Sequence, residues 1–164
     1  MEIRPAEPRD ADAIAAIYNA GIDGRGATFD TEHKTAGDVE GWLADGRPLL
    51  AAVADGQVVG WALAAAYSPK AYYAGVAEAS IYIDPEHRGR GTGSALMSAL
   101  AEAAERAGIH KLVGKLFAEH EASRGLVDRH GFREVGVHLR HGRLDGEWRD
   151  VILVELPLGE AAEG

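Results

Sequence analysis

The sequence contains no cysteine, and this absence excludes several classes of protein. Disulfide-stapled scaffolds, thiolate zinc sites and enzymes with a cysteine nucleophile all require that residue. A chain of 164 residues needs no such staples, because a domain of this size buries about two-thirds of its unfolded surface. A cysteine-free chain also suits the cytoplasm, where we expect the protein to work.

Long apolar runs and an excess of positive charge are missing as well. No apolar stretch approaches the roughly 20 residues that a membrane-spanning helix needs, and residues 1–4 lack the apolar core of a signal peptide. The chain carries 17 basic and 26 acidic residues, a net charge of −9. We therefore expect neither a membrane nor a nucleic acid as partner.

Hydrophobic periodicity and turn residues divide the chain into alternating strands and helices. Asp55-Gly56 and Asp145-Gly146 each separate two apolar runs and predict hairpins. Thr35 is a candidate N-cap for a second helix. The remaining predicted helices span 9–21, 94–107 and 121–130, and the predicted strands span 2–5, 49–54, 58–66, 76–83, 111–117, 135–144 and 148–156.

This order of elements predicts a single-domain α/β fold over residues 1–158, a mixed central sheet with helices on both faces. Residues 159–164 are small and acidic, and we expect them to form a disordered tail.

The segment Arg88-Gly89-Arg90-Gly91-Thr92-Gly93 lies between a predicted strand and the helix that starts at Ser94. Glycines let backbone N–H groups approach an anion, and a helix N-terminus adds unpaired donors. The segment therefore predicts a site for a phosphorylated ligand, with a merely tight strand–helix connection as the alternative. Its spacing matches neither the dinucleotide fingerprint nor the P-loop, which argues against a nucleotide-binding oxidoreductase.

The pattern Arg88-x-x-Gly91-x-Gly93 resembles the pyrophosphate loop of the GCN5-related N-acetyltransferases, which bind acetyl-CoA, and the element order fits that superfamily. Within it, the chain resembles the phosphinothricin acetyltransferase branch. Two strings are most similar to relatives that acetylate arsinothricin, the arsenic analogue of phosphinothricin. The segments that carry the branch resemblance are 17–19, 27–32, 77–83, 130–132 and 146–151, and the two arsinothricin-like strings are 73–78 and 143–146.

The resemblance implies an enzyme that transfers acetyl from acetyl-CoA to the α-amine of a small anionic amino-acid analogue. Arsinothricin, phosphinothricin and methionine sulfoximine are the candidate substrates, and acetylation would detoxify them. Two alternatives stay open. One is a non-catalytic regulatory module that binds acyl-CoA, and the other is an acetyltransferase for a different small amine.

Amine acetylation requires a base, because a protonated amine cannot attack a thioester. Glu78 is the candidate catalytic residue, since it lies within an apolar predicted strand. Burial there would disfavour the charged carboxylate and favour a base that works near neutral pH. The branch that the chain resembles carries a glutamate at this place. The alternative is a solvent-facing glutamate on an alternating strand.

The resemblance implies three contacts to acetyl-CoA. The backbone of Ile81, Tyr82 and Ile83 is expected to pair with the pantetheine arm like an added strand. The segment from Arg88 to Ser94 is expected to hold the pyrophosphate. A third contact falls at His120, where relatives usually have asparagine, with Ser123 three residues later.

An anionic amino-acid substrate demands cationic and hydroxyl donors. Lys70 and Tyr73 lie in the segment before Glu78, where this branch places substrate contacts, and Phe29 is a candidate wall of the pocket. Arg140 and Arg143 are further candidates, with solvated surface charge as the alternative for each.

The seven histidines do not predict a metal site. His138 and His141 are three residues apart on a predicted strand, and alternation would point them to opposite faces. No carboxylate completes a known ligand spacing, so we expect no metal. Relatives are commonly dimers, and the apolar last strand would offer an edge to a partner, so we expect a homodimer.

Overall fold

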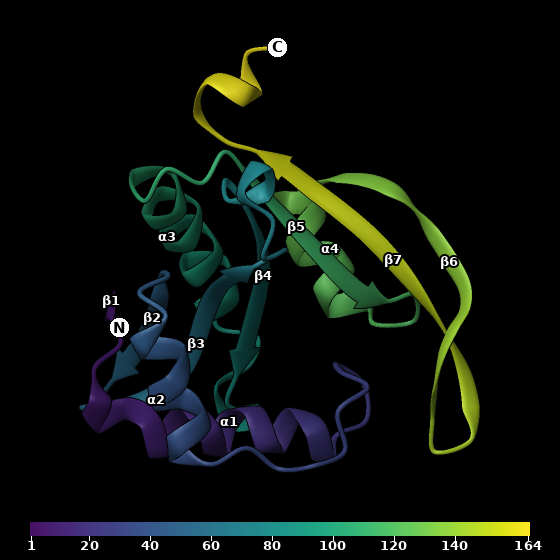
Figure 1. The fold of residues 1–164 in the computed structure, drawn as a ribbon. Helices are drawn as coiled ribbons and strands as arrows, with labels where there is room; N and C mark the ends of the chain where they lie inside the picture. Colours follow the sequence, from purple (N-terminus) through teal and green to yellow (C-terminus); the bar gives the residue numbers. More distant parts are fainter.

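Seven strands form one mixed sheet in the computed structural model, which describes residues 1–164. Their order is β1-β2-β3-β4-β5-β7-β6 (Figure 1). The β4–β5 pair is parallel, and every other neighbouring pair is antiparallel. The strands are β1 (Glu2–Pro5), β2 (Leu49–Ala54), β3 (Gln57–Ala66), β4 (Val76–Ile83), β5 (Lys111–Phe117), β6 (Arg133–Leu144) and β7 (Glu147–Pro157).

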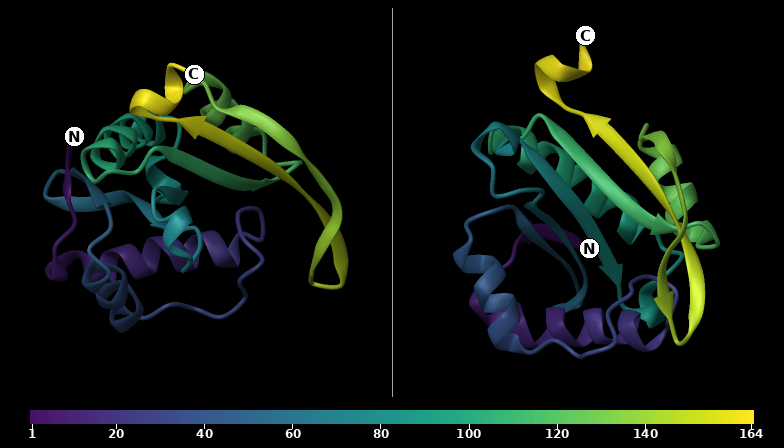
Figure 2. Two further views of the ribbon diagram at one scale, coloured as in Figure 1. Left: turned by 45° about the horizontal axis from the view of Figure 1, so that its top comes forward. Right: turned by 45° about the vertical axis from the view of Figure 1, so that its right-hand side comes forward.

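Helices cover both faces of this sheet (Figure 2). On β3, Trp61 and Leu63 pack with α1 and α2, whereas Ala62 and Ala64 belong to the larger core under α3 and α4. The period-two alternation of a strand thus divides the core into two layers. The predicted α/β fold is confirmed. The helices are α1 (Ala11–Asp23), α2 (Ala36–Ala44), α3 (Thr92–Arg106) and α4 (Glu121–Arg129).

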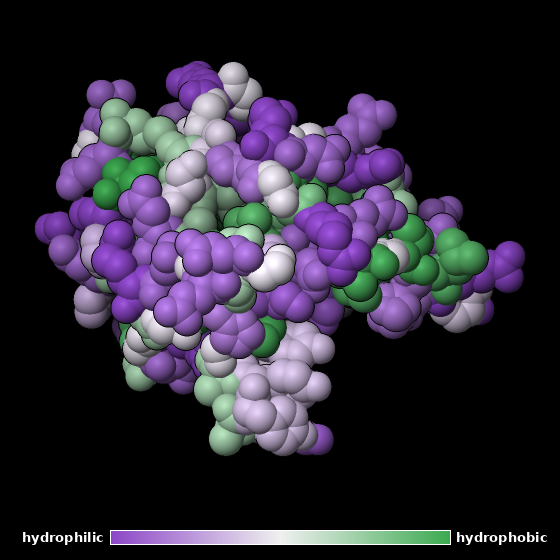
Figure 3. Space-filling model, turned by 90° about the horizontal axis from the view of Figure 1, so that it is seen from above, coloured by the Kyte–Doolittle hydropathy of each residue, from purple (hydrophilic) through white to green (hydrophobic).

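The β6–β7 hairpin projects from the body of the molecule (Figures 1 and 2). β7 lies between β5 and β6, so the outer edge is β6 and not the last strand, contrary to our expectation. Val135, Val137 and Leu139 of β6 are exposed, Leu139 to 75%. The view in Figure 3 shows apolar side chains gathered on this projecting arm.

A β-bulge in β6 overturns the prediction that His138 and His141 point to opposite faces. The register against β7 shifts between His138 and Gly142. Arg140 adopts φ of 49°, and its N–H donates to Asp150 Oδ1 at 2.7 Å. The extra residues of the bulge rotate the chain, and the two imidazole rings stack with centroids 4.1 Å apart.

The C-terminal segment is short and lies beyond β7. Residues 159–162 form a 3-10 helix, where the composition led us to expect disorder. Leu158 immediately before it is buried, and its N–H donates to the carbonyl of His110 at 2.8 Å. No helix in the structure has the length and apolar character needed to cross a membrane.

Candidate active site

β4 and β5 are paired only near their first residues. The parallel register ends at Glu78 opposite Val113, although β4 continues to Ile83 and β5 to Phe117. The N–H of Asp84 donates to Val59 on β3 at 2.9 Å. Because backbone groups alternate in direction along a strand, those of Ile81 and Ile83 face away from β3, into the gap. The sheet therefore contains an open strand edge in its interior.

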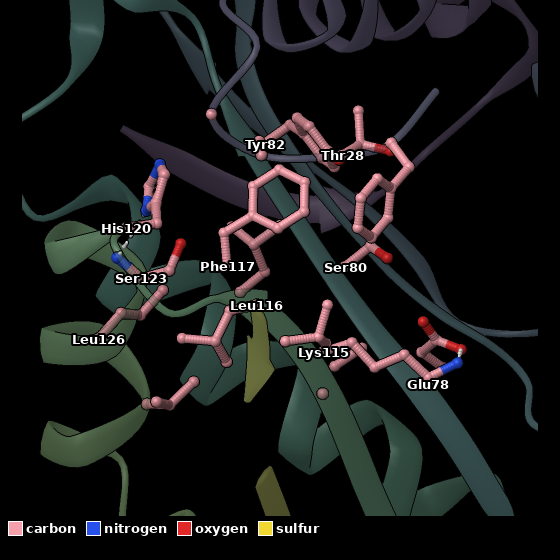
Figure 4. Close-up of a pocket in the computed structure, with 18 of the residues that line it drawn as sticks. Thr28, Glu78, Ser80, Tyr82, Lys115, Leu116, Phe117, His120, Ser123 and Leu126 are labelled. Carbon is pink, nitrogen blue, oxygen red and sulfur yellow. Dashed lines mark hydrogen bonds and ion pairs between the residues drawn. The ribbon is translucent and has the colours of Figure 1, made fainter. Parts of the chain in front are cut away.

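A cavity of about 540 Å³ lies where the two strands separate (Figure 4). Alternation directs Glu78, Ser80 and Tyr82 toward the α1 face and Ile81 toward the α3 face. The lining includes Tyr18 and Phe29 from the α1 side and Met97, Leu126 and Val127 from the α3 side. The cavity therefore opens onto both faces of the sheet.

Glu78 lies on the α1 face of this cavity beside Lys115 of β5 (Figure 4). Lys115 Nζ is 3.6 Å from Glu78 Oε2, and 34% of the Glu78 side chain is exposed. The prediction that Glu78 is buried is therefore wrong, because the separation of the strands opens it to solvent. A carboxylate with access to water can still exchange a proton with a bound amine.

Phe29 lies in the wall of the cavity as the sequence predicts. Its ring meets Phe117 of β5 edge-on, with centroids 4.8 Å apart. The ring also lies close to Gly142, where an added Cβ would be 2.8 Å from the ring. This close approach requires a glycine at position 142. The contact holds Phe29, in the loop after α1, in the cavity wall.

Tyr18 and Tyr82 form an aromatic wall next to this loop. Their ring centroids are 4.7 Å apart, and the Tyr18 hydroxyl donates to the Asp30 carboxylate. Burial, helped by the hydrogen bond to Asp30, raises the pKa of Tyr18 to about 12. Burial also raises the pKa of Tyr82. Both phenols therefore stay neutral near pH 7 and line the cavity as uncharged groups.

The glycine-rich segment forms the uncapped N-terminus of α3. Gly89 and Gly91 have φ of 72° and 82°, a region that favours glycine. Thr35 and His120 cap α2 and α4 with side-chain acceptors, but Gly91 offers α3 none. The first-turn N–H groups of α3 therefore have no side-chain partner, which is the arrangement of an anion site.

The segment from Arg88 to Ser94 carries two exposed arginines and contacts α4. Arg88 and Arg90 are exposed and take part in none of the ion pairs of the structure. Ser94 Oγ lies 2.7 Å from His130 Nε2, which ties α3 to the end of α4. Gly93 lies against Leu126, a residue of the cavity wall. The segment thus adjoins the α3 side of the cavity.

His120 and Ser123 both line the cavity at the start of α4 (Figure 4). The Ser123 N–H donates to His120 Nδ1 at 3.1 Å. The imidazole is therefore fixed by its capping role, and its Nε2 is left for a further contact. An asparagine at an N-cap accepts the same kind of hydrogen bond, so the exchange for histidine preserves the helix start.

Four predicted substrate residues do not line the cavity. Lys70 lies near the ring of Tyr72, 5.7 Å from its centroid, and Tyr73 is 42% exposed. Arg140 borders a separate polar depression, and Arg143 stacks on Trp148 at 4.2 Å. The geometry does not support a direct role for these residues. Lys115, which does line the cavity, was missed, because its position near Glu78 follows only when alternation along β5 is combined with the register against β4.

Residues 14–132 match the Acetyltransferase (GNAT) family, and the chain belongs to this family. It is 32% identical to the phosphinothricin N-acetyltransferase of Streptomyces coelicolor, over 96% of each chain. It is also 32% identical to the L-methionine sulfoximine/L-methionine sulfone acetyltransferase of Pseudomonas paraeruginosa, over 95% of this chain and 94% of the relative.

The fold agrees with a crystal structure of a GNAT superfamily phosphinothricin acetyltransferase from Sinorhizobium meliloti in complex with acetyl-CoA. The TM-score is 0.93 at 28% identity, over 99% of this chain and 91% of the other. The protein is therefore an N-acetyltransferase of a family that uses acetyl-CoA, and the predicted enzyme class is confirmed.

The contact between Phe29 and Gly142 yields a first prediction. In Gly142→Val the new side chain must displace the Phe29 ring, because even a Cβ would lie 2.8 Å from it. We expect KM for the acceptor amine to rise about 10-fold, the scale of one lost packing contact in a pocket, with KM for acetyl-CoA unchanged. Steady-state kinetics measures both values.

Gly136→Val on the same strand is the matched control, because a Cβ at Gly136 meets nothing within 4 Å. Equal effects of the two substitutions on acceptor KM would contradict the role of Phe29 as a wall.

Proposed function

We propose that this enzyme acetylates the α-amine of a small anionic amino-acid analogue of the arsinothricin, phosphinothricin or methionine sulfoximine type, and thereby confers resistance by detoxification. The observation that carries the proposal is the pairing of a carboxylate and an ammonium, Glu78 and Lys115, in the cavity between β4 and β5. Such a pair complements an acceptor that bears both charges. Relatives named for phosphinothricin and methionine sulfoximine support this substrate class.

Two features of the structure support the binding of acetyl-CoA. The open edge of β4 presents Ile81 and Ile83 to the amides of a pantetheine arm. The uncapped start of α3, with Gly91 in the left-handed region, fits a pyrophosphate. We assign the segment from Arg88 to Ser94 to this contact, and His120 with Ser123 to a further one. When bound, acetyl-CoA supplies an activated acetyl group.

We assign the role of general base to Glu78. Its carboxylate faces the cavity and, directly or through a water molecule, can accept the proton of an acceptor ammonium. The resulting neutral amine is the nucleophile. Phe29, Tyr18 and Tyr82 restrict the space around it, which favours an aligned approach. Backbone N–H groups that face the gap can polarise a carbonyl placed there.

We also infer that the enzyme works in the cytoplasm as a homodimer. Exposed apolar side chains on an outer strand are a surface that a second copy can cover. Val135, Val137 and Leu139 of β6 form such a surface.

The experiment that tests the proposed function is an assay of CoA thiol release with acetyl-CoA and a panel of acceptors. The panel holds phosphinothricin, methionine sulfoximine, arsinothricin, ordinary acidic amino acids, a polyamine and an aminoglycoside. We expect the highest kcat/KM for phosphinothricin, methionine sulfoximine or arsinothricin. A higher kcat/KM for the polyamine or the aminoglycoside would refute the substrate class and leave the acetyltransferase class intact.

Replacement of Gly91 tests the pyrophosphate site. A Cβ at Gly91 points into open space at the start of α3, so Gly91→Val should place its side chain where the pyrophosphate binds. We expect affinity for acetyl-CoA, measured by calorimetry, to fall at least 10-fold. Gly46→Val is the control, since Gly46 has a similar φ of 70° and also meets nothing within 4 Å.

Both valine variants should lose about 1–3 kcal/mol of stability, the cost of a non-glycine residue in the left-handed region. Unchanged acetyl-CoA affinity in folded Gly91→Val would exclude this segment from the binding site.

Glu78→Gln tests the general base. It preserves the shape of the side chain and removes its ability to take a proton. We expect kcat/KM for the acceptor to fall about 100-fold near neutral pH, the usual scale for loss of a general base. The deficit should shrink as pH rises, because free amine becomes abundant. A pH–rate profile that matches that of the parent would remove Glu78 from the mechanism.

A further inference from the structure

Lys115 is a charged residue of the cavity for which the family resemblance supplies no role. It lies on β5 two residues beyond Val113, the last residue that pairs with β4. Its side chain points to the same face as Phe117 and away from the core that holds Leu116. Lys115 therefore lies just beyond the point where the two strands begin to part, and its ammonium reaches back to the Glu78 carboxylate (Figure 4).

The charge pattern of the cavity makes this ammonium important. Among the lining residues, Lys115 is the sole lysine or arginine, and the ionisable groups with it are Asp30, Glu78, His120 and His141, beside the two neutral phenols. Asp30 accepts a hydrogen bond from Tyr18, and His120 caps α4. A bound anion would thus find one permanent positive charge in the cavity.

The ion pair with Glu78 contributes little to the fold. Half of the Lys115 side chain is exposed, and the 3.6 Å separation from Glu78 Oε2 is longer than a hydrogen bond. Exposed pairs of this kind contribute little to stability. Both groups can therefore give up this ion pair and form new ion pairs with the charges of a ligand.

We propose that Lys115 binds the α-carboxylate of the acceptor and so restricts this enzyme to α-amino acids. This proposal rests on the proposed function and identifies the residue that selects its substrate class. The amine to be acetylated must lie at Glu78, and the α-carboxylate is bonded to the same carbon as that amine. Two adjacent opposite charges on the acceptor thus match two adjacent opposite charges on the enzyme, Glu78 and Lys115.

The distal anion of the acceptor is a poorer partner for Lys115. In phosphinothricin-like molecules it is separated from the α-carbon by a chain of methylenes, whereas Lys115 Nζ lies 3.6 Å from the Glu78 carboxylate. Engagement of the α-carboxylate also draws Lys115 away from Glu78. Glu78 is then left with the acceptor ammonium as its partner, the pairing that proton transfer needs.

Lys115→Met tests the proposal with a matched pair of acceptors, phosphinothricin and its α-carboxamide, which lacks only the α-charge. We expect kcat/KM for the free acid to fall 10- to 100-fold, as for a lost charge-assisted hydrogen bond, while kcat/KM for the amide changes less than 3-fold. KM for acetyl-CoA should stay constant. Lys115→Arg, which keeps a positive charge, should retain most of the preference for the acid.

Lys111→Met is the control for removal of a lysine from β5, because Lys111 pairs with Glu155 outside the cavity. If Lys115→Met keeps the wild-type preference for the acid, or loses activity equally on acid and amide, this proposal is overturned and the proposed function stands. If the wild-type enzyme prefers an amine without an α-carboxylate, both are overturned. Thermal unfolding of each variant verifies that it is folded.

Discussion

The parting of β4 from β5 is the constraint on which the rest of the site depends. Two strands that run parallel would ordinarily continue to pair, but here each is held by its other neighbour. β3 pairs with β4 as far as Ile83, and β7 pairs with β5 as far as Phe117. These antiparallel ladders hold each strand to its other neighbour while β4 and β5 diverge. The unpaired backbone between them forms an open edge that suits an added strand or an extended ligand.

Strand alternation then places different kinds of side chain on the two faces of the sheet. On β4, Glu78 and Tyr82 face α1 while Ile81 joins the core under α3. On β5, Lys115 faces α1 and Leu116 faces α3. The charged and aromatic groups suited to an acceptor thus gather on one side. The apolar and helix-terminal groups suited to acetyl-CoA gather on the other, and the gap between the strands joins them.

Local patterns predicted most of the fold, because hairpin dipeptides, helix caps and alternation act over a few residues. The Asp55-Gly56 turn and the Thr35 cap are found where the sequence predicts them. The errors concern features that depend on contacts between residues distant in the sequence. Hydrophobic periodicity does not predict strand order, and the order makes β6 the outer strand. Nor does periodicity predict the bulge at Arg140, which brings His138 and His141 together.

The candidate site was predicted only in part, because it also depends on how strands that are distant in the sequence pair. Phe29, Glu78 and His120 line the cavity, but Lys115 could be found only by combining alternation on β5 with its register against β4. The assumed burial of Glu78 failed because periodicity does not reveal that two strands separate. Charge alone also misled, since Arg143 is held on Trp148 in the projecting hairpin.

The α1 side of the cavity bears on whether this chain is a catalyst or only a module that binds acyl-CoA. A binding module needs the open edge of β4 and the start of α3, and nothing more. Here the α1 side keeps a carboxylate, an ammonium and an ordered aromatic wall. Glu78 and Lys115 gain almost nothing for stability where they stand, and the close contact of Phe29 with Gly142 restricts what that glycine can become. Charged groups that contribute little to stability, gathered beside the gap between β4 and β5, fit a site that binds and deprotonates an acceptor.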